Sequence, residues 1–256
     1  MFNPNNSANT EQKNQTIEIK LGSYKYLGKK ISYAYTGENP NQVIFFIHGS
    51  PGSWKAYDEY LQDQELNKKA ILISVDRLGY GGSEKGIPEY SLENQAKYLS
   101  PILHLYPKSK IILVGHSYGG PVAIQIAGMY PERIKKIILL APSIDPELEE
   151  ILWYQKFGNT TVGRFLLPLS IDVSNQEIYT LKGELLKQNK IWKELDIPIT
   201  HIHGTEDNLV PFSNTEFIKK HLKNSANLKI IPLIGVNHFL VWNQFELIKE
   251  ELLKSY

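Results

Sequence analysis

The pentapeptide 115–119, Gly-His-Ser-Tyr-Gly, constrains the fold of this chain more than any other short segment. It lies between an aliphatic run, 111–114, and a helix-like stretch, 121–127. A turn this tight between a buried strand and a helix leaves room only for glycine two positions before and after the serine. The sequence Gly-x-Ser-x-Gly occurs by chance in many chains. In this setting it predicts a nucleophile elbow, with the Ser117 hydroxyl held out from the sheet edge in a strained backbone conformation.

Apolar runs alternate with helical patterns over most of the chain, which predicts an α/β fold with a mostly parallel, eight-stranded sheet flanked by helices. The first two expected strands alternate polar and apolar residues, as an antiparallel, half-exposed edge does, whereas the later ones are nearly continuous aliphatic runs typical of buried parallel strands. The expected strands are Ile17–Leu21, Lys30–Tyr35, Val43–Ile47, Ile71–Val75, Ile111–Val114, Lys136–Leu140, Ile199–His203 and Leu228–Pro232.

The segment 143–190 interrupts this alternation, because it contains helix-prone stretches and no aliphatic strand run. A long interruption after a strand of an α/β fold is usually functional. We expect a small helical cap, inserted after the sixth strand into a core formed by 17–142 and 191–256, and lying over the carboxyl ends of the strands. The alternative is a helical excursion that only packs on the core. Residues 1–16 are polar and rich in asparagine, which predicts a disordered tail.

Composition excludes several classes of function. The net charge is +1 and no run of lysine or arginine could follow a phosphate backbone, which argues against a nucleic-acid partner. The chain has no cysteine, so disulfides and thiol nucleophiles are excluded. No apolar stretch approaches the roughly 18 residues of a membrane span, and 1–16 lacks the apolar core of a signal peptide. A cytoplasmic location is expected, with a periplasmic one open if an upstream signal was removed; the oligomeric state is open.

A glycine- and proline-rich turn, 48–52 (His-Gly-Ser-Pro-Gly), directly follows the third expected strand. Such a turn can aim a backbone N–H at the same sheet edge as the elbow. We expect the N–H groups of Ser50 and Tyr118 to form an oxyanion hole beside Ser117. The alternative is an ordinary strand–helix turn.

An acid for a catalytic triad is expected after the seventh strand, at Asp207. A carboxylate there can orient an imidazole and stabilise its protonated form. The neighbouring Glu206 is expected on the surface, and Asp145, after the sixth strand, is the rival acid. Asp172 is expected at the surface or at a helix cap.

The base is expected at His238, because of the seven histidines it alone lies in a loop after the last strand. The other six belong to turn motifs, strands or helical patterns. The order Ser117, Asp207, His238 is that of one hydrolase architecture.

Five elements together carry a family resemblance: the turn 48–52, the loop 76–83 (Asp-Arg-Leu-Gly-Tyr-Gly-Gly-Ser), the elbow, the segment 204–207 (Gly-Thr-Glu-Asp) and His238. From about Ile17 onward the chain resembles α/β-hydrolase fold proteins of the capped, small-molecule type. In that family the loop 76–83 is structural, which implies that its first two residues shape the loop near the oxyanion turn.

The resemblance also separates subfamilies. Haloalkane dehalogenases and epoxide hydrolases of this fold have aspartate at the elbow, so Ser117 disfavours both. Proline iminopeptidases usually have Gly-Gly where this chain has Gly49-Ser50, and tryptophan where it has Tyr118, so a peptidase is disfavoured. A cofactor-free haloperoxidase, a C–C bond hydrolase or an acyltransferase would use the same triad and stays open. A non-catalytic binding homologue is the alternative from another class.

The resemblance implies a serine hydrolase that cleaves a small carboxylic ester through an acyl-serine intermediate, with no metal or other cofactor. Its partner would be a small-molecule substrate, whose identity the sequence leaves open. Aromatic residues of the expected cap and the residue after His238 are the candidates for substrate contact, although those of the cap could equally form its own core. They are Trp153, Tyr154, Phe157, Phe165 and Phe239.

Overall fold

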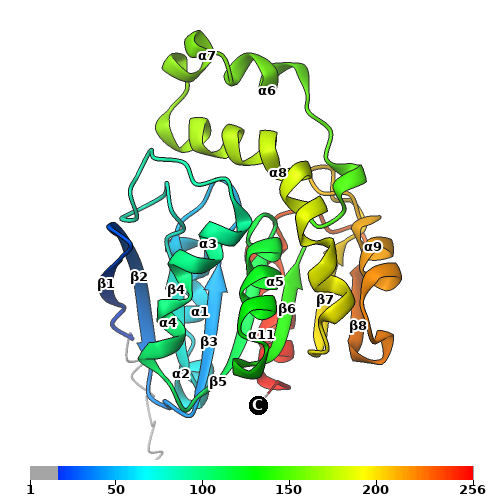
Figure 1. The fold of residues 1–256 in the computed structure, drawn as a ribbon. Coiled ribbons are helices and arrows are strands. Elements are labelled where there is room, and N and C mark those ends of the chain that lie inside the picture. The colour runs from blue at the N-terminus through cyan, green and yellow to red at the C-terminus, as the bar shows by residue number, and fades with distance from the viewer. Residues whose placement is uncertain (1–16, 256) are drawn as a thin grey trace, which may run out of the picture.

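A computed structural model describes residues 17–255 as one eight-stranded sheet with helices on both faces (Figure 1). The predicted disordered tail, 1–16, lies outside the described residues. The strands are β1 (Lys20–Tyr26), β2 (Lys29–Gly37), β3 (Gln42–Ile47), β4 (Ile71–Val75), β5 (Lys110–His116), β6 (Ile134–Leu140), β7 (Ile199–Gly204) and β8 (Leu228–Leu233).

The strand order is β1-β2-β4-β3-β5-β6-β7-β8. The pairs β1–β2 and β2–β4 are antiparallel and the remaining pairs are parallel, which confirms the predicted fold class and its antiparallel edge. The predicted bounds of the first strand, 17–21, are wrong. Leu27 and Gly28 both have positive φ (47° and 80°) and form a two-residue hairpin turn, which sets the register from Tyr26↔Lys29 and moves the strand to 20–26.

Eleven α-helices and four short 3-10 segments connect the strands within the described residues. The first helices are α1 (Asp58–Gln62), α2 (Gln64–Lys69), α3 (Leu92–Leu99), α4 (Pro101–Leu105) and α5 (Gly119–Met129). The later ones are α6 (Trp153–Gly158), α7 (Thr161–Leu166), α8 (Leu169–Glu194), α9 (Asn214–His221), α10 (Leu240–Asn243) and α11 (Phe245–Leu253). The 3-10 segments are η1 (Trp54–Tyr57), η2 (Pro131–Arg133), η3 (Pro146–Leu148) and η4 (Ser225–Asn227).

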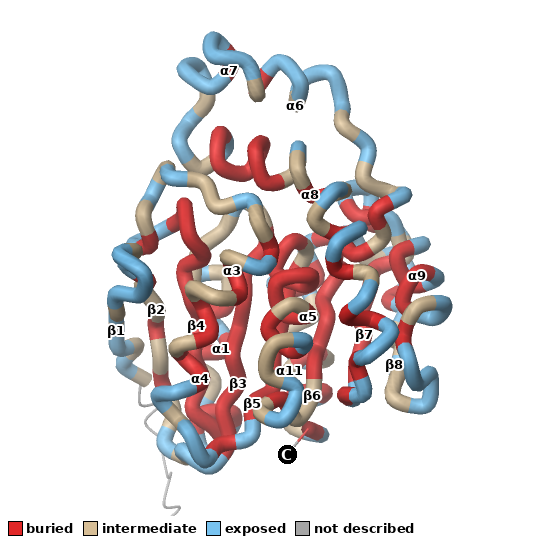
Figure 2. The backbone as a smooth tube through the Cα atoms, viewed as in Figure 1, coloured by how far each residue is buried: buried red, intermediate tan, exposed pale blue. Residues whose placement is uncertain are grey.

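The sheet separates two hydrophobic cores because successive side chains of a strand point to opposite faces. In β3, Val43 and Phe45 belong to one core, which α3, α5, α9 and the second half of α8 cover. Ile44 and Phe46 belong to the other, which α1, α2, α10 and α11 cover. The central strands are buried on both faces (Figure 2), as their aliphatic sequences predict.

The segment 143–190 contains no strand and forms η3, α6, α7 and most of α8. Helix α8 continues four residues past 190, because Leu185 and Trp192 are buried in the core that also contains residues of α5. The first half of α8 lies above the sheet, with α6 and α7 beyond it at the top of the molecule (Figure 1). Most of the α6–α7 backbone is exposed in Figure 2. The insertion therefore has an inner layer, the first half of α8, and an outer layer, α6–α7.

Candidate active site

Ser117 lies at the turn between β5 and α5 with a φ of 51°, the left-handed conformation of a nucleophile elbow. A Cβ atom at Gly119 would overlap the carbonyl oxygen of Ile47 in β3, and one at Gly115 would overlap the backbone of Gly119. Both glycines are therefore required by close backbone approach. The serine sits at the carboxyl end of a central strand, as expected from its sequence setting.

The predicted acid and base meet in a short hydrogen bond. His238 Nδ1–H donates to Asp207 Oδ2 at 2.7 Å, and both side chains are buried. The other carboxylate oxygen, Oδ1, accepts the backbone N–H groups of Leu209 and Val210 at 2.9 and 2.8 Å. Burial alone would raise the pKa of Asp207, but these hydrogen bonds and a contact with His203 outweigh it and lower the pKa below its usual value. Asp207 is therefore held as a carboxylate.

A second histidine, His203 of β7, also contacts this acid, and the sequence predicts only its place in a strand. His203 Nε2 donates to the carbonyl oxygen of Val210 at 2.9 Å and lies 3.3 Å from Asp207 Oδ2. His203 Nδ1 in turn accepts from His201 Nε2 at 3.0 Å. All of these imidazoles are fully buried, and burial holds the pKa of His201 well below its usual value. The only sequence signal for the contact is the position of His203 four residues before Asp207.

His116 connects the elbow to the loop that carries His238. Its Nε2–H donates to the His238 carbonyl oxygen at 3.1 Å, and the two rings lie 4.8 Å apart. Burial lowers the pKa of His116 to about 3, so the ring is neutral near pH 7. The Ser117 hydroxyl makes no hydrogen bond to the His238 ring or to any other group within residues 17–255. Such a contact often tightens only when substrate is present.

The predicted oxyanion turn lies beside the elbow. A Cβ atom at Gly49 would be only 3.0 Å from Ser117 Cβ, so the turn and the serine are in direct contact. Within the described part of the chain, neither Ser50 N–H nor Tyr118 N–H donates a hydrogen bond to a protein acceptor. The structure thus brings two unpartnered backbone donors next to Ser117.

A buried ion pair that the sequence did not reveal lies behind this turn. Arg77 Nη1 and Nη2 donate to Glu177 Oε1 and Oε2 at 2.5 and 3.0 Å, and both side chains have no exposed surface. Arg77 also donates from Nε to the carbonyl oxygen of His48 and from Nη2 to that of Gly49, at 3.0 and 2.9 Å. Burial opposes the charge of Arg77, but the Glu177 carboxylate outweighs it and raises the guanidinium pKa.

Glu177 collects further donors from the core. Tyr80 Oη donates to Oε2 at 2.7 Å, Ser50 Oγ to the same oxygen at 2.6 Å, and Gln95 Nε2 to Oε1 at 3.2 Å. The resemblance placed Arg77 near the oxyanion turn, where it is. Its partner comes from α8, 100 residues further along the chain, and no local pattern in the sequence indicates it.

The candidate substrate residues differ in position. Trp153 and Phe165 are 78% and 88% exposed, and Tyr154 and Phe157 are exposed as well, so these four side chains do not form an interior core of the insertion. Phe239 is half-exposed and its ring lies 6.0 Å from that of His238. Of the five candidates, Phe239 is the one adjacent to the His238–Asp207 pair.

The other acidic candidates lie elsewhere. Asp145 accepts the Glu147 N–H at the start of η3 and makes no hydrogen bond to His238. Glu206 is exposed, as expected. Asp172, expected at the surface or at a helix cap, is buried in the first turn of α8, where its carboxylate accepts from Arg164 and from Gln176.

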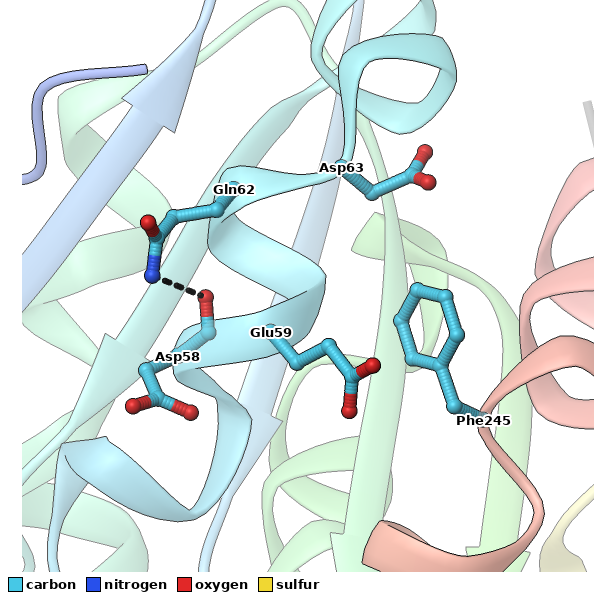
Figure 3. Close-up of a pocket in the computed structure, with 5 residues that line it drawn as sticks. All are labelled: Asp58, Glu59, Gln62, Asp63 and Phe245. Carbon is cyan, nitrogen blue, oxygen red and sulfur yellow. Dashed lines mark hydrogen bonds between the residues drawn. The ribbon is translucent and has the colours of Figure 1, made fainter. Parts of the chain in front are cut away.

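A surface depression is lined by a different set of residues (Figure 3). Asp58, Glu59, Gln62 and Asp63 of α1 and its C-terminal end line it, together with Phe245 at the start of α11. None of the five is a predicted site residue. Residues 17–255 also contain no cluster of three His, Cys, Asp or Glu side chains that could hold a metal ion. No helix in the same range is long and apolar enough to cross a membrane.

Several known proteins are similar in sequence to this chain. A putative 2-succinyl-6-hydroxy-2,4-cyclohexadiene-1-carboxylate synthase of Bacillus subtilis (strain 168) is 33% identical, over 80% of this chain and 88% of that protein. The serine hydrolase BPHL of Homo sapiens is 26% identical, over 89% of this chain and 84% of that protein. Three epoxide hydrolases of Caenorhabditis elegans, Mus musculus and Homo sapiens are 30–32% identical, but the chain spans only 27–35% of their length.

Among solved structures, Cfl2 of Burkholderia cenocepacia has the same fold, with a TM-score of 0.74 at 15% identity, covering 95% of this chain and 97% of that one. Residues 42–187, more than half of the chain, match the family described as alpha/beta hydrolase fold. With the synthase from Bacillus similar along nearly its full length, the chain belongs to the α/β-hydrolase fold family.

Proposed function

We propose that this protein is a serine hydrolase that cleaves a small carboxylic ester through an acyl-serine intermediate. The observation that carries the proposal is the 2.7 Å hydrogen bond between His238 Nδ1 and Asp207 Oδ2, on a loop tied by His116 to the elbow of Ser117. Family membership and the hydrolases among the relatives support it.

In the first half-reaction Ser117 Oγ attacks the ester carbonyl carbon while His238 Nε2 accepts the hydroxyl proton. Asp207 keeps the proton of the neutral ring on Nδ1, so that Nε2 is free to act as base, and it stabilises the imidazolium that forms. The N–H groups of Ser50 and Tyr118 bind the oxyanion of the tetrahedral intermediate, each contributing about 3–4 kcal/mol to the barrier reduction.

Collapse of this intermediate breaks the bond to the alcohol, which leaves with the proton from His238 Nε2. Water then attacks the acyl-serine, giving its proton to the same nitrogen, and a second tetrahedral intermediate forms in the same oxyanion hole. Its collapse releases the carboxylic acid and returns the proton to Ser117. The residues in this sequence need no metal ion for any step.

Epoxide opening, the reaction named for several relatives, fits the elbow poorly. A carboxylate that opens an epoxide forms an ester, which water can cleave at its carbonyl carbon. The Ser117 hydroxyl would instead form an ether, which has no carbonyl carbon for water to attack. The nucleophile at position 117 therefore favours acyl substrates.

A second candidate is a reaction on a ring that carries carboxylates. The relative from Bacillus is named for such a compound, and it is similar along most of both chains. Binding such an anion requires a cation that is not already neutralised. Arg77, which is next to the oxyanion turn, is paired with Glu177, so this candidate ranks second.

We assign the choice of substrate to the insertion 143–190, as a cap over the carboxyl ends of the strands. Phe239 is the first candidate for substrate contact because of its place beside His238. The exposed aromatic residues of α6 and α7, Trp153, Tyr154, Phe157 and Phe165, are the second.

The test is labelling and turnover with matched serine variants. A fluorophosphonate should label the wild-type protein stoichiometrically, and Ser117→Ala should abolish both labelling and turnover of a short p-nitrophenyl ester. Ser143→Ala is the control, because this buried hydroxyl lies near the elbow but bonds to Glu149. It should keep both activities.

Wild-type-like turnover by Ser117→Ala would refute the proposal. A protein that is folded but is neither labelled nor active on ester, thioester, amide and lactone panels would favour a binding homologue. Products formed with added alcohols or with diketone substrates would identify an acyltransferase or a C–C bond hydrolase, and peracid-dependent halogenation would identify a haloperoxidase.

A further inference from the structure

The peptide group between Gly49 and Ser50 carries both a candidate oxyanion donor and an anchored acceptor. Its N–H belongs to Ser50 and its C=O to Gly49, and in a trans peptide these point in opposite directions. The Gly49 oxygen accepts two hydrogen bonds, from His48 Nδ1 at 2.7 Å and from Arg77 Nη2 at 2.9 Å. Fixing the oxygen therefore fixes the direction of the N–H on the other side of the plane.

The proton positions of this anchor are determined by its partners. The Arg77 backbone N–H donates to His48 Nε2 at 3.0 Å, so Nε2 is the acceptor nitrogen and Nδ1 carries the hydrogen. Burial and the nearby guanidinium hold the pKa of His48 well below its usual value, so the ring stays neutral. One neutral and one charged donor thus act on the Gly49 oxygen. Donors on a carbonyl oxygen polarise the peptide and strengthen its N–H as a donor.

The side chain of Ser50 is anchored to the same carboxylate as Arg77. Its hydroxyl lies 2.6 Å from Glu177 Oε2, and Tyr80 Oη donates to that oxygen as well. A serine hydroxyl has one hydrogen, and the carboxylate is its strongest nearby acceptor. The Ser50 hydroxyl is therefore an anchor of the turn, and only the backbone N–H of Ser50 is available to an oxyanion.

We propose that Glu177 of α8, acting through Arg77 and Ser50, is a positioning residue that sets the direction of the Ser50 N–H and so couples the insertion to the oxyanion hole. The inference rests on the proposed serine hydrolase function. It goes beyond a structural ion pair, because Glu177 holds the Gly49–Ser50 peptide from two sides. Through Arg77 it holds the Gly49 carbonyl oxygen, and through the Ser50 hydroxyl it holds the residue that carries the N–H.

A preorganised donor helps only if it points at the charge that develops in the transition state. Loss of Glu177 should leave ground-state binding nearly intact and weaken oxyanion binding. Removing a whole oxyanion donor costs about 100- to 1,000-fold in kcat, so misdirecting one should cost roughly 10- to 100-fold.

The test compares Glu177→Gln with Glu184→Gln. Both substitutions neutralise a carboxylate of α8, but Glu184 lies seven residues later and bonds to the Leu92 N–H and to Lys187. The measurements are kcat and KM on a p-nitrophenyl ester and the Ki of a trifluoromethyl ketone, which forms a hemiketal oxyanion on the serine. Glu177→Gln should lower kcat roughly 10- to 100-fold, change KM by less than about threefold and raise the Ki by the same factor as the loss in kcat. Glu184→Gln should change none of the three by more than about twofold.

Equal losses in the two variants, or an unchanged ketone Ki in a folded Glu177→Gln protein, would overturn the inference. If Glu177→Gln does not fold, Ser50→Ala decides, because it keeps the backbone N–H and removes the hydroxyl that bonds to Glu177, together with its contacts to Tyr80 and Ser174. It should then show a parallel loss of roughly three- to tenfold in kcat and ketone affinity, and unchanged values would overturn the inference. Failure of the proposed function is distinct: there the wild-type protein is neither labelled nor active.

Discussion

The two layers of the insertion 143–190 are held in different ways. The inner layer contains six consecutive buried residues, 172–177, so the helix is enclosed on all sides by the core below and the outer layer above. Five of the six are polar, and Glu177 receives four donor side chains. The outer layer exposes most of its large apolar side chains and attaches to α8 through a few polar contacts, such as Asn175 Nδ2 to the Gln155 carbonyl oxygen at 3.0 Å.

This difference shows that directional hydrogen bonds hold the inner layer in place, whereas only a few contacts hold the outer layer. Hydrogen bonds to a buried carboxylate specify geometry, because a displaced donor leaves an unsatisfied buried charge. Exposed aromatic side chains impose no such requirement. We therefore expect the inner layer to behave as part of the α/β core, and the outer layer to tolerate change in sequence and position.

The largest expected effect comes from breaking the anchor of the inner layer. Glu177→Leu should lower the free energy of unfolding by about 3–5 kcal/mol, because it leaves Arg77 as a buried charge without a partner. The double variant Arg77→Met/Glu177→Leu should recover most of this loss, since both charges are removed together. Urea denaturation of the wild-type, both single variants and the double variant measures the coupling. Additive losses would mean that the two side chains do not stabilise the layer as a pair.

Acid should destabilise the core without acting on the outer layer directly. Burial lowers the pKa of His116 to about 3 and those of His48 and His201 well below the usual 6.5. Below pH 6.5 the unfolded chain binds protons that the native protein does not, so the free energy of unfolding falls as the pH falls from about 6.5 towards 3. Each histidine should contribute about 1.4 kcal/mol per pH unit in that window.

Chemical denaturation between pH 7.5 and 5 measures this slope. His201→Leu removes one of the three groups and should reduce the slope by about 1.4 kcal/mol per pH unit. Residues 153–166, which form the outer layer, contain no Asp, Glu or His, so limited proteolysis within them should be insensitive to pH above the unfolding transition. A slope unchanged by the substitution would mean that His201 protonates normally in the folded protein.

The smallest effect on stability is expected in the outer layer. Phe165→Ser should change the free energy of unfolding by no more than about 0.5 kcal/mol, because the side chain is 88% exposed. If this layer contacts substrate, the same variant should raise KM for esters with longer apolar chains while leaving kcat for a short ester unchanged. A stability loss above about 2 kcal/mol would show that Phe165 packs against the protein and would remove the contrast between the layers.

Much of the fold could be predicted from local patterns. The aliphatic runs that became β3 to β7 are almost entirely buried, and a strand of that kind needs only its own composition to be recognised, whereas the edge strand β8 is only partly buried. The first strand was misplaced because its ends depend on the Leu27-Gly28 turn rather than on its alternation. Helix α8 ends at Glu194, four residues past the expected boundary at 190, because its apolar face meets the core there.

The candidate site divides in the same way. Asp207 and His238 could be chosen from their positions after strands, and they form a hydrogen bond in the structure, while their catalytic roles stay a proposal. The partners of Asp172 and Glu177 could not be predicted, because a carboxylate on a polar helix has the same local sequence pattern whether it is solvated or paired with other side chains. The partners of Glu177 lie 82 to 127 residues away in the chain.

The sequence by itself therefore determined the elbow at 115–119, since tight backbone approach admits only glycine and fixes the serine locally. It also determined where along the chain most strands lie and that Asp207 and His238 each follow a strand, because each of these features depends on a short segment. Only the tertiary structure decided which hydrogen-bond donors already have a protein acceptor and which carboxylates are buried. It also decided which layer of the insertion reaches the oxyanion turn. Those properties arise from contacts between distant segments, where desolvation makes a partner essential and no local pattern records which partner it is.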